Sequence, residues 1–256
     1  MLDVNQFNQL SWDAQVESGN QWTIPVSTEE VQAARQGKWD VFLTPTKPVP
    51  KDWFPELNGS SILCLGSGGG QQGPLLAAGG AEVTVFDQSP KQLAQDRMVA
   101  ERDNLNIQTV QGDMADLSAF DDGIFDLIVH PVSNCFVADV RPVWREAQRV
   151  LKSGGQLFSG LVNPLIYIFE QEGFEKGLFK IINAIPYSDL KSLSAEKLKE
   201  YEEKHYPLEF GHSLNDLVAG QIEAGLVITG FYEDTWELHA LSQYIATFFV
   251  TRALKG

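Results

Sequence analysis

From Ser61 onward, the chain alternates between short apolar runs and longer stretches with helical patterning. A continuous apolar run that ends in glycines or polar residues is typical of a parallel strand buried on both faces. We therefore expect strands at residues 62–65, 83–86, 107–110, 125–129, 156–162, 227–232 and 245–252.

Helix signals lie between these runs. Ser89 followed by Pro90 predicts a helix start, because serine caps the first turn and proline loses no hydrogen bond there. Further helices are expected through residues 75–78, 139–151 and 213–224, the second ending in the basic and glycine residues 152–155. The repeated strand–helix order predicts an α/β fold with a parallel sheet and right-handed crossovers.

Two regions depart from this alternation. Residues 1–58 hold four of the six tryptophans, and the proline-rich stretch 44–50 cannot be helical. Residues 163–212 interrupt the pattern and contain one amphipathic helix near 190–201. We expect an N-terminal helical extension over 1–58 and a main domain over 59–256, with 163–212 inserted as a cap.

Composition narrows the function classes. The 256 residues are 43% hydrophobic and 21% charged, which is typical of a globular chain with a full core. The net charge of -15 disfavours nucleic acid as a partner, because binding to phosphates depends on lysine and arginine. No run approaches the roughly 18 apolar residues of a membrane helix, and no signal peptide is evident. With two cysteines and no disulfide framework, we expect a cytoplasmic protein.

The candidate chemistry begins where the first strand ends. Residues 66–70 read Gly-Ser-Gly-Gly-Gly and open a helix, so bare backbone and a positive helix end face a ligand. Asp87 ends the second strand, where a carboxylate accepts hydrogen bonds from ribose hydroxyls. This pair predicts a nucleoside site. It leaves open a methyltransferase, a nicotinamide-dependent dehydrogenase (Gly68, Gly70 and Gly73 match its glycine spacing) and a structural turn.

Further segments favour the first alternative. Residues 62–70 resemble the first motif of the class I S-adenosylmethionine (SAM)-dependent methyltransferases. Residues 111–114, 125–129 and 149–155 resemble the family's segments at the third, fourth and fifth strands. The resemblance covers about residues 60–162, and the whole chain is similar to an uncharacterised bacterial branch. One departure is Cys64, which stands where the family usually carries an acid.

The resemblance implies a Rossmann-like seven-stranded mixed sheet of order 3-2-1-4-5-7-6, with its last strand antiparallel and helices on both faces. It also implies SAM as the cofactor and S-adenosylhomocysteine (SAH) as the product. The implied contacts are Gly66, Ser67, Gly68 and Gly70 at the methionine portion, Asp87 at the ribose, Gln88 and Met114 at the adenine ring, and Asp113 at the adenine amino group.

No catalytic residue follows from the fold, because SAM supplies the electrophile and a base is needed only for a protonated acceptor. His130, at the end of the fourth strand, is the candidate base and a candidate cofactor contact; the alternative is a histidine that only packs there. Asn134, Tyr167 and Tyr187 are candidate acceptor contacts. Cys135 has no evident partner as a nucleophile.

We expect a small-molecule acceptor, because the cap leaves little open basic surface. No metal is expected, since the spacing of the histidines matches no ligand pattern. The rival functions are a nicotinamide-dependent oxidoreductase and a SAM-binding protein without catalysis. The sequence predicts neither the acceptor atom nor the oligomeric state.

Overall fold

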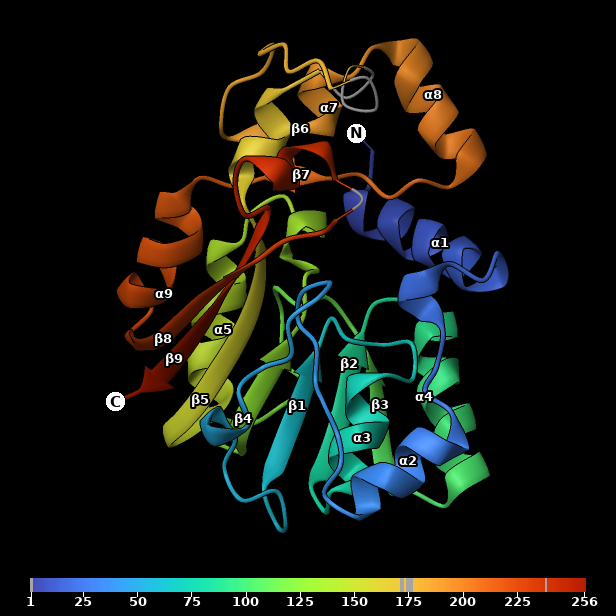
Figure 1. Cartoon of the computed structure of the whole chain (residues 1–256), viewed down its shortest axis with the longest axis vertical. Helices are drawn as coiled ribbons and strands as arrows, with labels where there is room; N and C mark the ends of the chain where they lie inside the picture. Colours follow the sequence, from blue (N-terminus) through green and yellow to red (C-terminus); the bar gives the residue numbers. More distant parts are fainter. Residues whose placement is uncertain (1, 171–172, 174–176, 238) are drawn as a thin grey trace.

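A computed structural model describes residues 2–170, 173, 177–237 and 239–256. Its centre is a seven-stranded sheet of order β3-β2-β1-β4-β5-β9-β8 (Figure 1). β9 pairs antiparallel with β5 and β8, whereas the strands from β3 to β5 pair in parallel. Within this sheet the order is the expected 3-2-1-4-5-7-6, so the predicted fold is confirmed. The strands are β1 (Ser61–Leu65), β2 (Glu82–Asp87), β3 (Ile107–Gln111), β4 (Phe125–His130), β5 (Leu151–Val162), β8 (Leu226–Asp234) and β9 (Phe248–Lys255).

Both faces of the sheet are covered. The helices α3 (Gln72–Ala78) and α4 (Pro90–Asp103) pack on one face, together with Ile62 of β1. The helices α5 (Arg141–Val150) and α9 (Gly220–Glu223) pack on the other, where Leu63 belongs to the core. Neighbouring β1 residues thus enter opposite cores, as a strand buried on both faces requires.

The predicted helix start at Ser89 is confirmed, because its side chain accepts a hydrogen bond from the N–H of Gln92. The helix expected near 190–201 is instead two helices, α7 (Asp189–Ser192) and α8 (Ala195–Lys204). Ser194 caps the second one by accepting from the N–H of Lys197, and this local bond starts a new helix.

Two element boundaries differ from expectation. α5 ends at Val150, and β5 begins at once because Leu151 already pairs with Phe125 of β4. β9 starts at Phe248 rather than at residue 245. Residues 244–247 instead form a turn and bends that follow the 3-10 helix η6 (Ala240–Gln243), which is capped by the side chain of His239.

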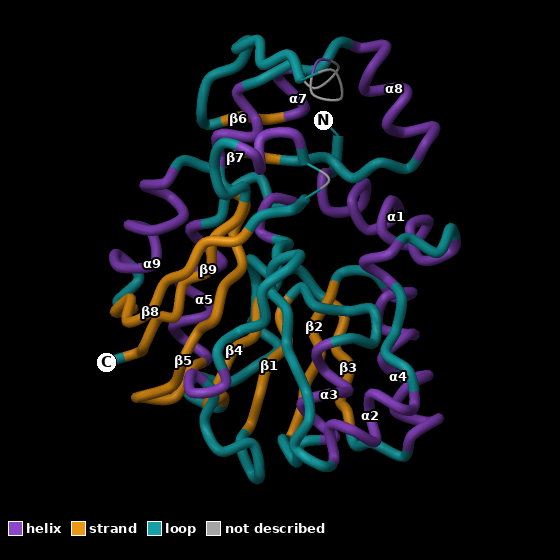
Figure 2. The backbone as a smooth tube through the Cα atoms, viewed as in Figure 1, coloured by secondary structure: helices purple, strands orange, loops and turns teal. Residues whose placement is uncertain are grey.

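The N-terminal region and the insertion meet above the carboxyl ends of the parallel strands (Figures 1 and 2). The N-terminal region contributes α1 (Val4–Glu17) there, whereas α2 (Thr28–Arg35) packs lower down, against α3 and α4. Asn8 of α1 is fully buried, donates to the carbonyls of Phe136 and Leu208, and accepts from the N–H of Leu208. These bonds tie α1 to the segment that leads into β7 (Phe210–Gly211), which pairs with β6 (Tyr187–Ser188).

None of the helices in the described part of the chain is both long and apolar enough to cross a membrane.

The segment 41–49 turns back on itself, because Phe42 and Pro48 form an antiparallel bridge, and it lies close to the sheet. The carbonyl of Leu43 accepts from the N–H of Val132, and a Cβ on Gly160 of β5 would overlap that same carbonyl. We therefore expect Gly160→Ala to lower the free energy of unfolding by about 1–3 kcal/mol, the usual cost of overpacking. Urea denaturation measures this change.

The matched control is the neighbouring Ser159→Ala, because the buried Ser159 hydroxyl has no hydrogen-bond partner among the described residues. Its removal is expected to leave stability unchanged or slightly higher. Equal stability of the Gly160 variant and this control would contradict the close packing of residues 41–49 on β5.

Candidate functional site

A cavity of about 660 Å³ opens at the carboxyl ends of β1, β2, β3 and β4. This is the position where open α/β sheets bind ligands, because the strand order reverses there. Its floor is formed by residues that directly follow the strands: Gly66, Ser67, Gly68, Asp87, Gln88, Gly112, Asp113, Met114, Pro131, Val132 and Ser133. Its roof comes from both regions outside the strand–helix alternation and from the segment between β8 and β9, and it includes Trp12, Trp22, Phe42, Ile166, Tyr167, Glu209, Trp236 and Phe248.

The glycine loop presents bare backbone to this cavity. Gly66 has a φ of 56°, and a Cβ on it would lie 2.7 Å from the Oγ of Ser133. Glycine is therefore required there by both conformation and space. A Cβ on Gly68 would lie 2.7 Å from the Cβ of Gln92. Ser67 donates to the side chain of Gln72, which fixes the loop between them.

The Asp87 carboxylate lies on the cavity floor beside this loop. It accepts hydrogen bonds from the N–H of Gly68 at 3.0 Å and from the N–H of Ser89 at 2.9 Å. Burial raises the pKa of Asp87 above its usual value, although these two N–H groups act in the opposite direction. Its fixed orientation leaves acceptor capacity for a ligand, since a carboxylate offers about four lone-pair sites.

The residues expected at the adenine end are brought together. Gln88, Asp113 and Met114 all line the cavity. Asp113 accepts from the N–H of Ala115 at 2.9 Å and from the side-chain amide of Asn5, on α1, at 2.6 Å. The N-terminal helix therefore reaches over the loop after β3 and holds one wall of the cavity.

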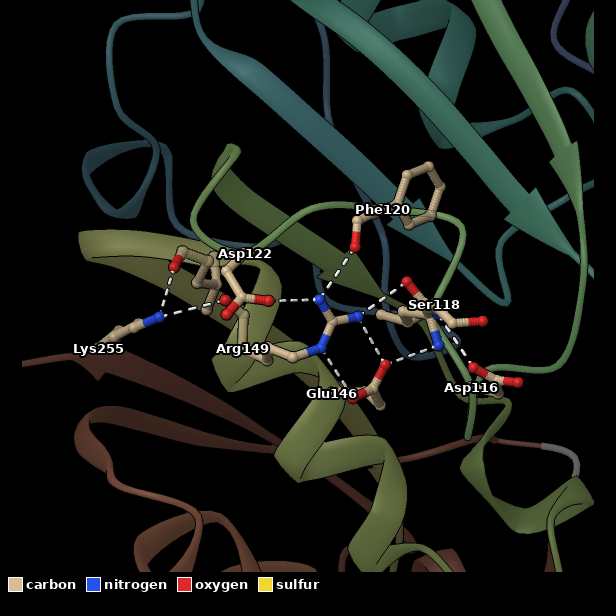
Figure 3. A network of polar contacts seen from close by, with 9 residues as sticks. Asp116, Ser118, Phe120, Asp122, Glu146, Arg149 and Lys255 are labelled. Carbon is tan, nitrogen blue, oxygen red and sulfur yellow. Dashed lines mark hydrogen bonds and ion pairs between the residues drawn. The ribbon is translucent and has the colours of Figure 1, made fainter.

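The loop after β3 is anchored from below by Arg149 of α5 (Figure 3). The guanidinium donates to the carbonyls of Leu117 and Phe120, each at 2.9 Å. It also pairs with Asp122 at 2.7 Å and with Glu146 at 2.8 Å. Glu146 in turn accepts from the N–H of Leu117. This network fixes the segment that follows Asp113 and Met114.

Two residues expected to contact the cofactor lie outside the cavity. Gly70 is covered by the N-terminal segment: its carbonyl accepts from Val26, and a Cβ on it would lie 2.8 Å from Pro25. His130 is fully buried on the α5 side of the sheet, with its ring 6.1 Å from that of Trp144. Its Nδ1 lies 2.7 Å from the carbonyl oxygen of Leu65.

The position of His130 favours the second alternative given for it, a histidine that only packs there. Burial lowers its pKa to about 4, so the imidazole is neutral near pH 7. Its ring is directed at α5 rather than at the cavity floor, because alternate residues of a strand point to opposite faces of the sheet. His130 is therefore not placed to act as a base toward a ligand in the cavity.

Of the three candidate acceptor contacts, one lines the cavity and two lie outside it. Tyr167 lines the cavity. Asn134 is buried and donates to the carbonyl of Gly160, so it holds the loop after β4. Tyr187 stacks on Tyr167 at 5.2 Å and donates to Asp189, behind the cavity wall.

Sequence reasoning missed two acids. Glu209 lies on the cavity wall, although it stands in a segment without any motif. Asp96 of α4 is fully buried and accepts from the N–H of Gly69 at 3.0 Å, beneath the glycine loop. Burial raises the pKa of Asp96 to about 7. The sequence signal for the burial of Asp96 is its position between Leu93 and Val99 on the apolar face of α4, where an acid has no access to solvent.

Comparisons with known proteins agree with this geometry. The sequence model of the methyltransferase domain family matches residues 63–159. An uncharacterised methyltransferase of Bacillus subtilis, YbaJ, is 54% identical over 97% of both chains. A ubiquinone biosynthesis O-methyltransferase of Pseudomonas aeruginosa is 28% identical over 69% of this chain and 86% of its own.

A solved structure extends the comparison to the fold. The SAM-dependent methyltransferase of Mesorhizobium loti superposes with a TM-score of 0.62 over 80% of this chain and 95% of its own, at 19% identity. At that identity the likeness supports the fold alone.

Proposed function

The chain belongs to the class I SAM-dependent methyltransferases, and on that premise we propose that its cavity binds SAM on the floor and a small-molecule acceptor under the roof. The observation that carries the proposal is the meeting of Gly66, Gly68 and Asp87 in one enclosed space. Glycine backbone and a strand-end carboxylate at a switch point suit a nucleoside with a charged tail.

The residues on the floor fit this cofactor. Gly66 leaves room that a Cβ would fill, and the loop carries no side chain larger than serine at 66–68. We assign the methionine portion to residues 66–68, the ribose hydroxyls to Asp87, and the adenine to Gln88, Asp113 and Met114. When bound, SAM supplies an electrophilic methyl group, so the chain has only to orient the acceptor and exclude water.

The register of the glycines favours SAM over a nicotinamide cofactor. Gly66 and Gly68 line the cavity, whereas Gly70 does not. The dehydrogenase spacing would need Gly70, its second glycine, against the pyrophosphate, and here a Cβ on Gly70 would instead lie 2.8 Å from Pro25 of the N-terminal segment. The comparisons give no support to an oxidoreductase.

A small-molecule acceptor is supported by the enclosure. Residues of the N-terminal region and of the insertion roof the cavity, so these regions act as one cap over a main domain that starts near residue 59. The name of the Pseudomonas aeruginosa relative, a ubiquinone biosynthesis O-methyltransferase, describes methylation of an oxygen, which favours the same class of acceptor here.

Methyl-labelled SAM tests this proposal. We expect the protein to transfer label into the small molecules of a whole-cell extract of Bacillus subtilis, the source of the 54% identical relative. Gel filtration separates labelled metabolites from labelled protein and RNA. Label that appears only in macromolecules, or in no fraction, would overturn the proposed acceptor class.

A further inference from the structure

Three ionisable side chains meet on the roof wall of the cavity. Cys135, Tyr167 and Glu209 all line it, although they stand on three separate segments. The Tyr167 hydroxyl donates to the Oε2 of Glu209 at 2.9 Å, and Tyr167 itself is only 4% exposed. This bond fixes one carboxylate oxygen, and the carboxylate keeps further acceptor capacity on the cavity side.

No cation neutralises this carboxylate within the described chain. Glu209 forms no ion pair there, and neither lysine nor arginine is among the described residues that line the cavity. The charged lining residues are instead acids: Glu30, Asp40, Asp87, Asp113 and Glu209. A phosphate or carboxylate on the acceptor would find no lysine or arginine among these lining residues, so the lining favours neutral or cationic molecules.

The groups that face Glu209 from other elements also lack positive charge. Asp189 of α7 accepts from the Glu209 N–H at 2.6 Å, and Tyr187 of β6 donates to Asp189. Tyr201 of α8 and Cys135 complete the ionisable surroundings. The pKa of Cys135 lies well above its usual range, first because of burial and then because of Glu209, so the thiol is neutral.

These surroundings shift the pKa of the Glu209 carboxyl group. Burial, and then the charge of Asp189, raise the pKa of Glu209 to about 7, against the lowering effect of the Tyr167 hydroxyl. A base with a pKa near the working pH is the most effective in proton transfer, since it is both available and strong enough.

We propose that Glu209 is the general base of the methyl transfer, held by Tyr167, and that the acceptor is a neutral or cationic molecule with a hydroxyl or amine nucleophile and an apolar body. The inference rests on the proposed function. Phe136, Val162, Ile166 and Phe248 supply the apolar surface beside Glu209 on the same cavity. The acceptor's oxygen or nitrogen bonds to the methyl carbon, the carbon–sulfur bond breaks with its electron pair left on sulfur, and the acceptor's proton passes to Glu209.

The first test needs no acceptor. Infrared spectra of the whole protein are recorded over a pH titration for the wild type and for Glu209→Gln. The difference between the two series isolates the protonated-carboxyl band of Glu209 from that of Asp96. As the pH rises, this band is expected to disappear with a midpoint near pH 7. Tyr167→Phe is expected to move the midpoint upward, because it removes a hydrogen bond that lowers the pKa. A midpoint in the ordinary range of a glutamate would overturn the inference.

The second test uses methyl-labelled SAM and the same bacterial extract. Glu209→Gln is expected to lower product formation by roughly 10²- to 10⁴-fold, the usual contribution of a general base, and to leave SAM affinity unchanged. In the wild type the rate should rise with pH through about 7, because Glu209 accepts a proton only when ionised. Glu202→Gln, at an exposed position on α8, is the matched control and should retain wild-type activity.

The labelled product distinguishes the outcomes. It should pass an anion exchanger, and its chemistry shows whether oxygen or nitrogen was methylated. Product that binds the exchanger, or an unchanged rate and pH profile in Glu209→Gln, would overturn the inference and leave the proposed function standing. A wild-type protein that forms no product would overturn the proposed function, and the role of Glu209 with it.

Discussion

Asp87→Ala is expected to weaken SAM binding by about 10- to 100-fold. A hydrogen bond to a charged group contributes about 1.5–3 kcal/mol, and each 1.4 kcal/mol corresponds to a factor of ten in affinity. Asp87 is held on the cavity floor by the N–H groups of Gly68 and Ser89, so its acceptor atoms are oriented before any ligand arrives. Calorimetric titration with SAH measures the change directly.

Two further variants separate the ligand contact from a loss of structure. Asp87→Asn keeps the size of the side chain and removes its charge, so we expect an intermediate loss of affinity. Glu82→Gln changes an exposed acid at the opposite end of the same strand and should bind SAH as the wild type does. If Asp87→Ala binds SAH with wild-type affinity, Asp87 is not the residue that holds the ribose hydroxyls.

Arg149→Met is expected to lower the free energy of unfolding by about 2–4 kcal/mol. The change removes the donor of the Phe120 carbonyl, one of two donors of the Leu117 carbonyl, and the cation beside Glu146. Loss of a partly buried network of this kind belongs to the more costly class of single substitutions. Urea denaturation measures the change.

The same variant should also weaken SAH binding, because Arg149 anchors the segment that follows Asp113 and Met114 (Figure 3). Arg145→Met provides a control on the same helix, since Arg145 is exposed. This control is expected to change stability by less than about 0.5 kcal/mol, as is usual for surface positions. Equal stability of the two variants would show that the network contributes nothing.

The individual strands and the acid on the cavity floor could be predicted because their signals are local, whereas the strand order was implied by the family resemblance. The apolar run at 62–65, the cap at Ser89 and the acid at Asp87 each reveal a structural role within a few residues. Parallel strands bring their carboxyl ends to one edge, so the sequence predicts Asp87 near the glycine loop, and the family resemblance adds Asp113.

The roof could not be predicted, because its contacts join distant parts of the chain. Glu209 meets Tyr167 across 42 positions, and Asn8 meets Leu208 across 200. The direction of the His130 side chain could not be predicted for a different reason. Alternation along β4 puts His130 on the same face as Ile128, but only packing such as the contact with Trp144 shows that this face is the one covered by α5.

The departure at Cys64 also has a physical explanation that needed the structure. The thiol is fully buried and burial raises its pKa, so it cannot supply the negative charge of the family's usual acid. Asp96 approaches the loop from α4 instead and accepts from Gly69. A carboxyl group therefore supports the glycine loop here from a helix rather than from the first strand.

A crystal structure of the protein with SAH tests the central claim most directly. The account predicts the nucleoside on the cavity floor, with ribose hydroxyls within about 3.2 Å of the Asp87 carboxylate and the adenine beside Gln88 and Met114. SAH bound anywhere else, or bound on this floor without contact to Asp87, would contradict it.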